Sequence, residues 1–110
     1  MRFGERIRQL REDKGLSQRA LAGQLDVHFT YLSKIETGDL DFSGVPSGRL
    51  ICKLAESLGA DKDELLILAG KVPESIRRRV FERPEAFLAF ASFDDPAIDS
   101  ALRAGRRKRS

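Results

Sequence analysis

Apolar side chains recur every three or four residues over the first 70 residues, which is the spacing of helices with one buried face. The recurrence predicts five helices, and no alternating strand pattern competes with it. An all-α fold is therefore expected. The apolar positions that mark the five helices are Phe3, Ile7 and Leu10; Ala20, Leu21 and Leu25; Val27, Leu32 and Ile35; Leu50, Ile51, Leu54, Ala55 and Leu58; and Leu65, Leu66 and Leu68.

Polar residues and glycines predict where several of these helices begin and end. Ser17 precedes a run of helix formers and is suited to cap the second helix. Asp61, followed three residues later by Glu64, resembles a capping box that opens the fifth helix. Gly38 is suited to the left-handed position that ends the third helix. Residues 16–38 therefore read as two short helices joined by a tight turn.

The outward face of the third predicted helix, about residues 28–36, carries the side chains of greatest functional interest. An exposed phenylalanine is unfavourable unless a thymine methyl group or a neighbouring side chain covers it. Hydroxyl and amino groups on the same face can reach base edges or phosphates. The pattern favours DNA binding, whereas the simpler alternative is a helical hairpin packed on a partner protein. The outward set is Phe29, Thr30, Ser33 and Lys34.

Residues 3–38, FGERIRQLREDKGLSQRALAGQLDVHFTYLSKIETG, resemble the phage-repressor/Cro-like family of helix-turn-helix regulators, also called the XRE family. The Lys14-Gly15 turn, the Ser17-Gln18 pair and the final Ile35-Glu36-Thr37-Gly38 occur in the family's order. The likeness reaches about residue 70 when the two later helices are included. It implies a five-helix repressor-like DNA-binding domain whose third helix enters the major groove.

The resemblance also implies roles for individual residues. Gln18 would bond a phosphate and brace the recognition helix. Arg11 and Glu36 would form a partly buried ion pair that serves folding rather than base reading. The following loop departs from the family, because Asp39 and Asp41 stand where relatives often carry lysine or arginine. The implied DNA-binding residues are Gln18, Arg19, His28, Phe29, Thr30, Ser33 and Lys34.

Beyond residue 70 the chain becomes rich in phenylalanine, with four of its seven located between residues 81 and 93. Pro73 can open a sixth helix, Arg83-Pro84 interrupts it, and residues 96–102 can form a last short helix. We expect residues 1–70 to be the DNA-binding domain and residues 71–102 a helical arm. A homodimer interface is favoured over packing of the arm back onto the domain. The apolar residues assigned to a dimer or partner interface are Ile76, Val80, Phe81, Phe87, Leu88, Phe90 and Phe93.

The net charge of +3 depends on the end of the chain. Five of the 20 basic residues lie in residues 103–110, so the remaining 15 are outnumbered by 17 acidic residues. A short charged tail of this kind is expected to be disordered. It would either add salt-sensitive attraction to phosphates or have no dedicated role.

Other function classes find little support in the composition. There is no apolar run long enough to span a membrane and no signal-peptide pattern, and the single Cys52 suits the reducing cytoplasm of a prokaryotic or phage protein. One histidine and one cysteine cannot form a conventional zinc site. No catalytic constellation stands out, so neither enzymatic activity nor a cofactor is expected.

Two functions remain in view. The favoured one is a dimeric repressor that binds double-stranded DNA at a palindromic operator. The alternative is an antitoxin-like protein whose arm binds a partner and whose DNA binding is autoregulatory. In some relatives of the family, the corresponding arm meets a toxin, an antirepressor or a metallopeptidase.

Overall fold

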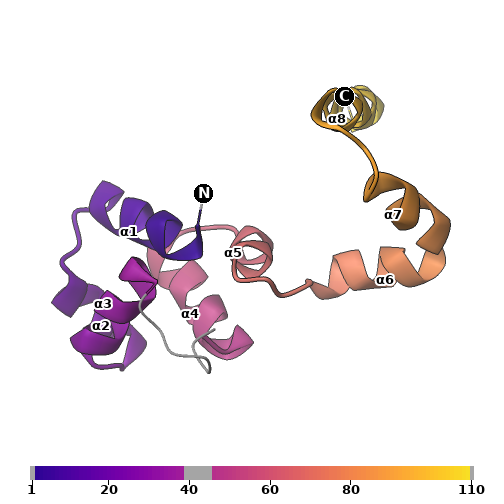
Figure 1. Ribbon diagram of the computed structural model, residues 1–110. Helices are drawn as coiled ribbons and strands as arrows, with labels where there is room; N and C mark the ends of the chain where they lie inside the picture. The colour runs from indigo at the N-terminus through magenta and orange to yellow at the C-terminus, as the bar shows by residue number, and fades with distance from the viewer. Residues whose placement is uncertain (1, 39–45, 110) are drawn as a thin grey trace. The chain divides into compact units, whose positions relative to one another are not determined.

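Eight helices make up the described part of the chain, and no strand occurs there. The structure is a computed structural model that describes residues 2–38 and 46–109, with side chains described as far as residue 106. The predicted all-α class is confirmed, whereas Asp39 and Asp41 lie outside the described residues. The helices in Figure 1 are α1 (Phe3–Asp13), α2 (Gln18–Leu25), α3 (Phe29–Thr37), α4 (Gly48–Leu58), α5 (Lys62–Leu68), α6 (Glu74–Glu82), α7 (Pro84–Phe90) and α8 (Asp95–Arg109).

Local contacts explain why these helices begin and end where they do. The Ser17 hydroxyl accepts a hydrogen bond from the N–H three residues later at 3.0 Å, and the Asp61 carboxylate accepts one from two residues later at 2.9 Å. Each contact satisfies a backbone donor that the helix leaves unpaired. Gly38 ends α3 at φ +75°. Glu64, the expected capping-box partner of Asp61, accepts a hydrogen bond from Arg6 at 2.8 Å and so ties α5 to α1.

The core of the first five helices is aliphatic. Helices α1 and α2 each pack on both α3 and α4, and α4 packs on α5. The sequence predicts Ala20 on the apolar face of α2, but Ala20 is exposed and Ala22 is buried. Helix α2 packs on both α3 and α4, so the residues that are buried are those that face these two helices. Burial of each leucine or isoleucine stabilises the fold by roughly 1.5–3 kcal/mol. The buried core residues are Ile7, Leu21, Ala22, Leu25, Leu32, Ile35, Ile51, Leu54, Ala55, Leu58 and Leu65.

Gly4 allows the start of α1 to lie directly against the end of α3. A Cβ atom at this position would lie 2.3 Å from the carbonyl oxygen of Ile35 and 2.6 Å from that of Glu36. Both neighbours are backbone atoms, which cannot rotate away as a flexible side chain would. The glycine therefore sets how closely α3 is held to α1.

The chain divides into two compact units, Met1–Pro73 and Glu74–Ser110. Within the second unit, α6 packs on α7, and Pro84 at the start of α7 separates the two helices. Arg83 forms an ion pair with Glu85 beside this break, and its hydrogen bond lowers the pKa of the Glu85 carboxyl group. Asp94 begins α8 by accepting a hydrogen bond from the Ala97 N–H at 3.0 Å.

Helix α8 continues to Arg109, whereas residues 103–110 were expected to be disordered. Alanine and arginine are good helix formers, and cations in the last turns of a helix interact favourably with its dipole. Arg103 and Arg106 lie in this second half, so the basic residues extend the helix instead of ending it. Among the described residues, no helix is both long and apolar enough to cross a membrane.

Candidate nucleic-acid interface

Helices α2 and α3 are joined by a short turn centred on Asp26. This residue adopts φ +57°, and it is the single non-glycine residue with positive φ in the described part of the chain. The Val27 N–H bonds the Ala22 carbonyl at 3.0 Å, and the Asp26 N–H bonds the Gly23 carbonyl at 3.3 Å, which closes the end of α2 as a Schellman motif. A short polar side chain tolerates this conformation better than most. The turn thereby sets the direction of α3 relative to α2.

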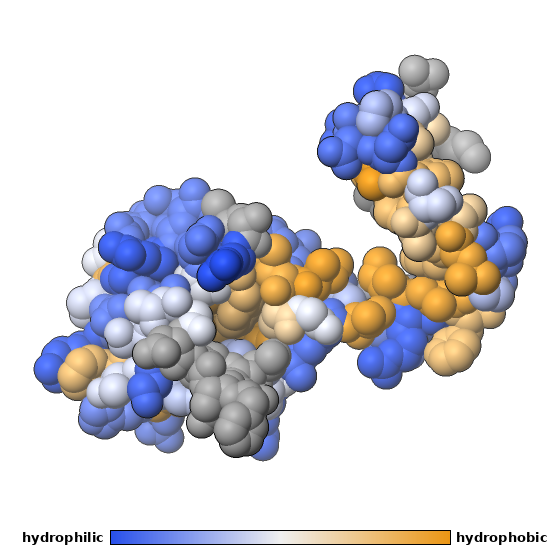
Figure 2. Space-filling model, viewed as in Figure 1, coloured by the Kyte–Doolittle hydropathy of each residue, from blue (hydrophilic) through white to orange (hydrophobic). Residues whose placement is uncertain are grey.

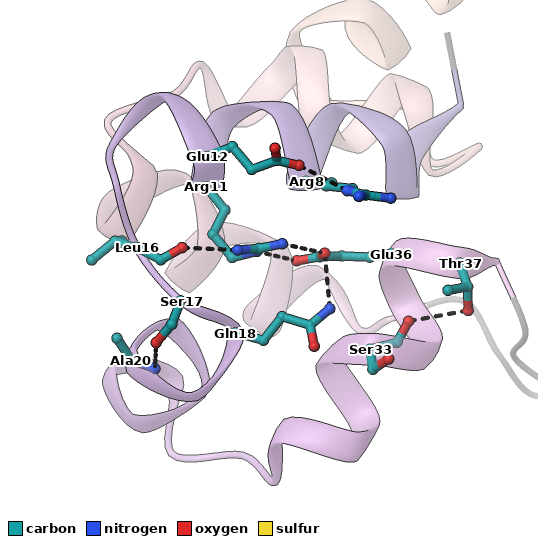
Figure 3. Close-up of polar contacts among 10 residues, drawn as sticks. All are labelled: Arg8, Arg11, Glu12, Leu16, Ser17, Gln18, Ala20, Ser33, Glu36 and Thr37. Carbon is teal, nitrogen blue, oxygen red and sulfur yellow. Dashed lines mark hydrogen bonds and ion pairs between the residues drawn. The ribbon is translucent and has the colours of Figure 1, made fainter.

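A single carboxylate, that of Glu36, connects the first three helices (Figure 3). Arg11 donates from Nε to Oε2 at 2.7 Å and from Nη2 to Oε1 at 3.0 Å. Gln18 donates from Nε2 to Oε1 of the same carboxylate at 3.1 Å. The third Arg11 nitrogen donates to the Leu16 carbonyl at 2.8 Å. The family resemblance joins Arg11 to Glu36 and expects Gln18 to brace α3. In the structure Gln18 reaches α3 through the same Glu36 carboxylate, and the Leu16 carbonyl adds the turn before α2 to the network.

Electrostatics in this network favour the charged form of Arg11. Its hydrogen bond to Glu36 raises the pKa of the guanidinium group, and the attraction between the charges adds to this effect while burial opposes it. The side chains of Arg11 and Glu36 are 12% and 2% exposed. The pair is therefore shielded from solvent and has bidentate geometry, which makes it stronger than a surface ion pair.

Phe29 is half-buried at the start of α3 and is covered by protein side chains. Its ring packs against the core, the guanidinium carbon of Arg19 lies 4.0 Å from the ring centroid, and the His28 ring stacks 5.0 Å away. The sequence leaves open whether a thymine methyl group or a neighbouring side chain covers this ring, and in the structure neighbouring side chains cover part of it. A thymine contact through the remaining ring surface stays a prediction.

The outward face of α3 exposes hydrogen-bonding side chains. Thr30 and Lys34 are exposed, and their side chains form no hydrogen bond or ion pair with other described residues, while Ser33 is half-buried. His28 caps the helix, because its Nδ1 accepts a hydrogen bond from the Thr30 N–H at 3.2 Å. The Thr37 hydroxyl donates back to the Ser33 carbonyl at 3.1 Å. Thr30 and Lys34 are thus exposed polar side chains of α3 for which the described residues provide no polar partner.

Sequence reasoning missed two cations next to the start of α3. Arg49 and Lys53 of α4 line a shallow depression of about 480 Å³ together with His28 and Tyr31. The sequence does contain a pattern that indicates this pair: Ser47 marks the start of α4, and Arg49 and Lys53 are four residues apart, so both lie on one face of the helix. These cations supply positive charge that the acidic composition of the domain did not suggest.

The arm exposes most of the apolar side chains assigned to an interface. Figure 2 shows apolar side chains gathered over the second unit, none of whose α6 or α7 residues is buried. Phe81 and Leu88 are 79% and 77% exposed, and Val80 is half-buried. Phe90 and Phe93 contact each other with ring centroids 5.4 Å apart. Ile76, Phe87, Phe90 and Phe93 are each about 40% exposed.

Comparison with protein families identifies a helix-turn-helix domain over residues 2–66. The chain is 33% identical over 93 residues to the HTH-type transcriptional repressor RghR of Bacillus subtilis (strain 168), covering 77% of this chain and 67% of that protein. It is 38% identical over 66 residues to the control protein C.MunI of a Mycoplasma species, covering 59% of this chain and 84% of the relative.

Among solved structures, the complex of the SinR protein with the SinI protein resembles this chain with a TM-score of 0.54. The match covers 97% of each chain at 23% sequence identity. At this identity the likeness concerns the fold alone.

Proposed function

Because the chain belongs to the helix-turn-helix family of DNA-binding transcriptional regulators, we propose that it is a dimeric repressor that reads a palindromic operator through the major groove. The observation that carries this proposal is the two-sided nature of α3. One side is fixed to the scaffold through Glu36, and the other exposes Thr30 and Lys34. Regulators of this family act by binding DNA and are not typically enzymes.

Base reading is assigned to Arg19, Thr30 and Lys34. Arginine and lysine donate to O6 and N7 of guanine, the most common specific contact in the major groove. The Nδ1 atom of His28 accepts a hydrogen bond from the Thr30 N–H, which leaves Nε2 as the ring nitrogen that can donate to DNA. Hydrogen-bond donors gathered at the start of α3 favour operator half-sites whose major groove presents acceptor atoms, above all O6 and N7 of guanine.

Phe29 has a positioning role in this proposal. Its ring lies under the guanidinium group of Arg19, whose N–H groups find no acceptor within the described residues. Stacking of this kind is worth about 0.5–1 kcal/mol at an exposed site and limits where the guanidinium group lies. The guanidinium group of Arg19 is therefore held in place, with its N–H groups available as donors, in the absence of DNA.

Phosphate contacts are assigned to groups around the reading face. Gln18 uses one N–H on Glu36, which leaves its second N–H for a phosphate oxygen. Ser33 is a candidate from α3, and Arg49 and Lys53 are candidates from α4. Such contacts determine register and affinity rather than sequence preference.

Dimerisation through the arm would match the symmetry of a palindrome. Two recognition helices about 34 Å apart meet successive major grooves on one side of the DNA. Exposed Phe81, Phe87 and Leu88 give the arm an apolar surface that a second copy would cover. Burial of each such side chain contributes about 1.5–3 kcal/mol.

Selection of binding sites from a random DNA pool tests the proposed function. We expect a two-fold symmetric site with guanine in each half, and an asymmetric site or no enrichment would contradict the proposal. Arg19→Ala should abolish the preference at one guanine, and Phe29→Leu should weaken the same preference. Arg78→Ala is the matched control, because Arg78 is an exposed arginine of α6 outside the interface.

A second candidate function is binding of a different protein through the arm. The fold match to a structure described as a SinR–SinI complex, together with the exposed phenylalanines, supports this alternative. The partner would be a toxin, an antirepressor or a metallopeptidase. Co-expression with the product of the adjacent gene tests it: a stable one-to-one complex that removes the homodimer would favour partner binding over self-association.

A further inference from the structure

Helix α8 has an apolar face with little cover from the described chain. Ile98, Ala101, Leu102 and Gly105 follow the spacing that places residues on one side of a helix. Leu102 is 50% exposed, and a hollow of about 280 Å³ lies beside it, lined also by Ala101 and Gly105. A Cβ atom at Gly105 would meet nothing within 4 Å, so another helix has room to approach closely there.

Two opposite charges lie beside this apolar face. Asp99 follows Ile98, and Arg106 follows Gly105, so both flank the face on the same side. They are seven residues apart, which is just under two helical turns. Neither has an ion-pair partner in the described part of the chain. The flank is therefore acidic toward one end of α8 and basic toward the other.

We propose that α8 pairs in antiparallel orientation with α8 of a second copy of this chain. In a two-fold symmetric antiparallel pair, the same flank of each helix faces the other. Asp99 of each copy would then lie opposite Arg106 of the second, giving two identical ion pairs. The inference rests on the dimer of the proposed function and names the surface and the direction of pairing.

The same geometry places the symmetry axis beside Leu102. Each Leu102 side chain would enter the hollow that Ala101 and Gly105 leave on the other copy. A parallel pair would bring opposite flanks together and leave Asp99 away from Arg106.

Charge exchange tests this arrangement. Asp99→Arg places like charges opposite each other at both contacts, and so does Arg106→Asp. Each variant should weaken dimerisation by roughly tenfold or more at low salt, since two attractive exposed pairs become repulsive. The double variant Asp99→Arg/Arg106→Asp restores both pairs and should dimerise as the unmodified protein does. Analytical ultracentrifugation of the full chain at about 50 mM salt measures these dissociation constants, and the difference should shrink as salt screens the charges.

An equal mixture of the two single variants adds a second test of direction. One copy then carries two arginines and the other two aspartates, so the mixed dimer should form in preference to either homodimer. Single variants that dimerise normally would overturn the proposal. Loss of dimerisation that neither the double variant nor the mixture restores would overturn it too.

DNA binding separates failure of this inference from failure of the proposed function. Binding of each variant to one half-site and to the full palindrome is measured in parallel. If the single-exchange variants remain dimeric and bind the palindrome cooperatively, the α8 pairing is wrong while the proposed function stands. If the unmodified protein is monomeric and shows no preference for the palindrome, the proposed dimeric repressor is wrong, and the α8 pairing falls with it.

Discussion

Replacement of Glu36 by alanine should lower the free energy of unfolding of the first unit by about 3–5 kcal/mol, the cost expected when one partner of a buried ion pair is removed. The Glu36 side chain is 2% exposed and accepts three hydrogen bonds, two from Arg11 and one from Gln18. Alanine leaves the Arg11 charge shielded from water with the Leu16 carbonyl as its remaining partner. Because a small domain is stable by only about 5–15 kcal/mol, the loss is a large share of the total.

Urea unfolding at pH 7, followed by helical circular dichroism, measures this loss. The hydrogen bond to Glu36 raises the pKa of Arg11, so the stability linked to Arg11 titration is fully present below the ordinary arginine pKa. It is lost only as the pH rises through the raised value, which lies far above the assay pH. The experiment therefore reports on the charged pair.

Glu12→Ala is the matched control for this substitution. Glu12 forms a 2.7 Å ion pair with Arg8, but its side chain is 55% exposed, and such helical pairs contribute about 0.3–0.5 kcal/mol. If Glu36→Ala costs no more than Glu12→Ala, the network through Glu36 does not hold the domain together. The same result would remove the physical basis for treating α3 as rigidly mounted.

Three further substitutions follow from the structure. Gly4→Ala should destabilise the fold by roughly 1–3 kcal/mol in the same unfolding assay, because the new Cβ atom would meet two backbone oxygens. Gly23→Ala is the control: it has open space around it and should stabilise α2 by about 0.5–1 kcal/mol. Lys34→Ala should weaken operator binding by about 1–3 kcal/mol and random-DNA binding by less, as measured by fluorescence anisotropy, and equal losses would make Lys34 a phosphate contact. Phe87→Ala combined with Phe90→Ala should shift the monomer–dimer equilibrium toward monomer in sedimentation experiments, and a variant still fully dimeric at low micromolar concentration would exclude these rings from the interface.

Helix limits could be predicted wherever the signal is local. Ser17 and Asp61 accept hydrogen bonds from N–H groups two or three residues away, and Gly38 relieves a left-handed backbone. These interactions depend on short stretches of chain, so the residue types indicate them directly. The end of α8 differs from the prediction, because the charge of the last residues favours disorder while their helix propensity and the helix dipole favour extension of the helix.

The candidate site was harder to predict, because its geometry depends on residues distant in sequence. The family resemblance connects Arg11 to Glu36, but no local pattern shows that Gln18 shares the same carboxylate. The cover on Phe29 comes from Arg19, ten residues earlier, and depends on the angle at which α2 meets α3. Side-chain direction at such positions follows from tertiary packing rather than from periodicity.

On α3, the residues proposed to read DNA are different from those that hold the helix in the fold, and this has an evolutionary consequence. The side chains of Thr30 and Lys34 form no hydrogen bond or ion pair with the described scaffold, whereas Leu32, Ile35 and Glu36 are buried and hold the helix in place. If the exposed positions read the operator as proposed, a duplicated gene would acquire a new operator through a few codon changes there, without an intermediate that fails to fold. Regulators with different targets would in this way diverge within one genome while keeping one scaffold.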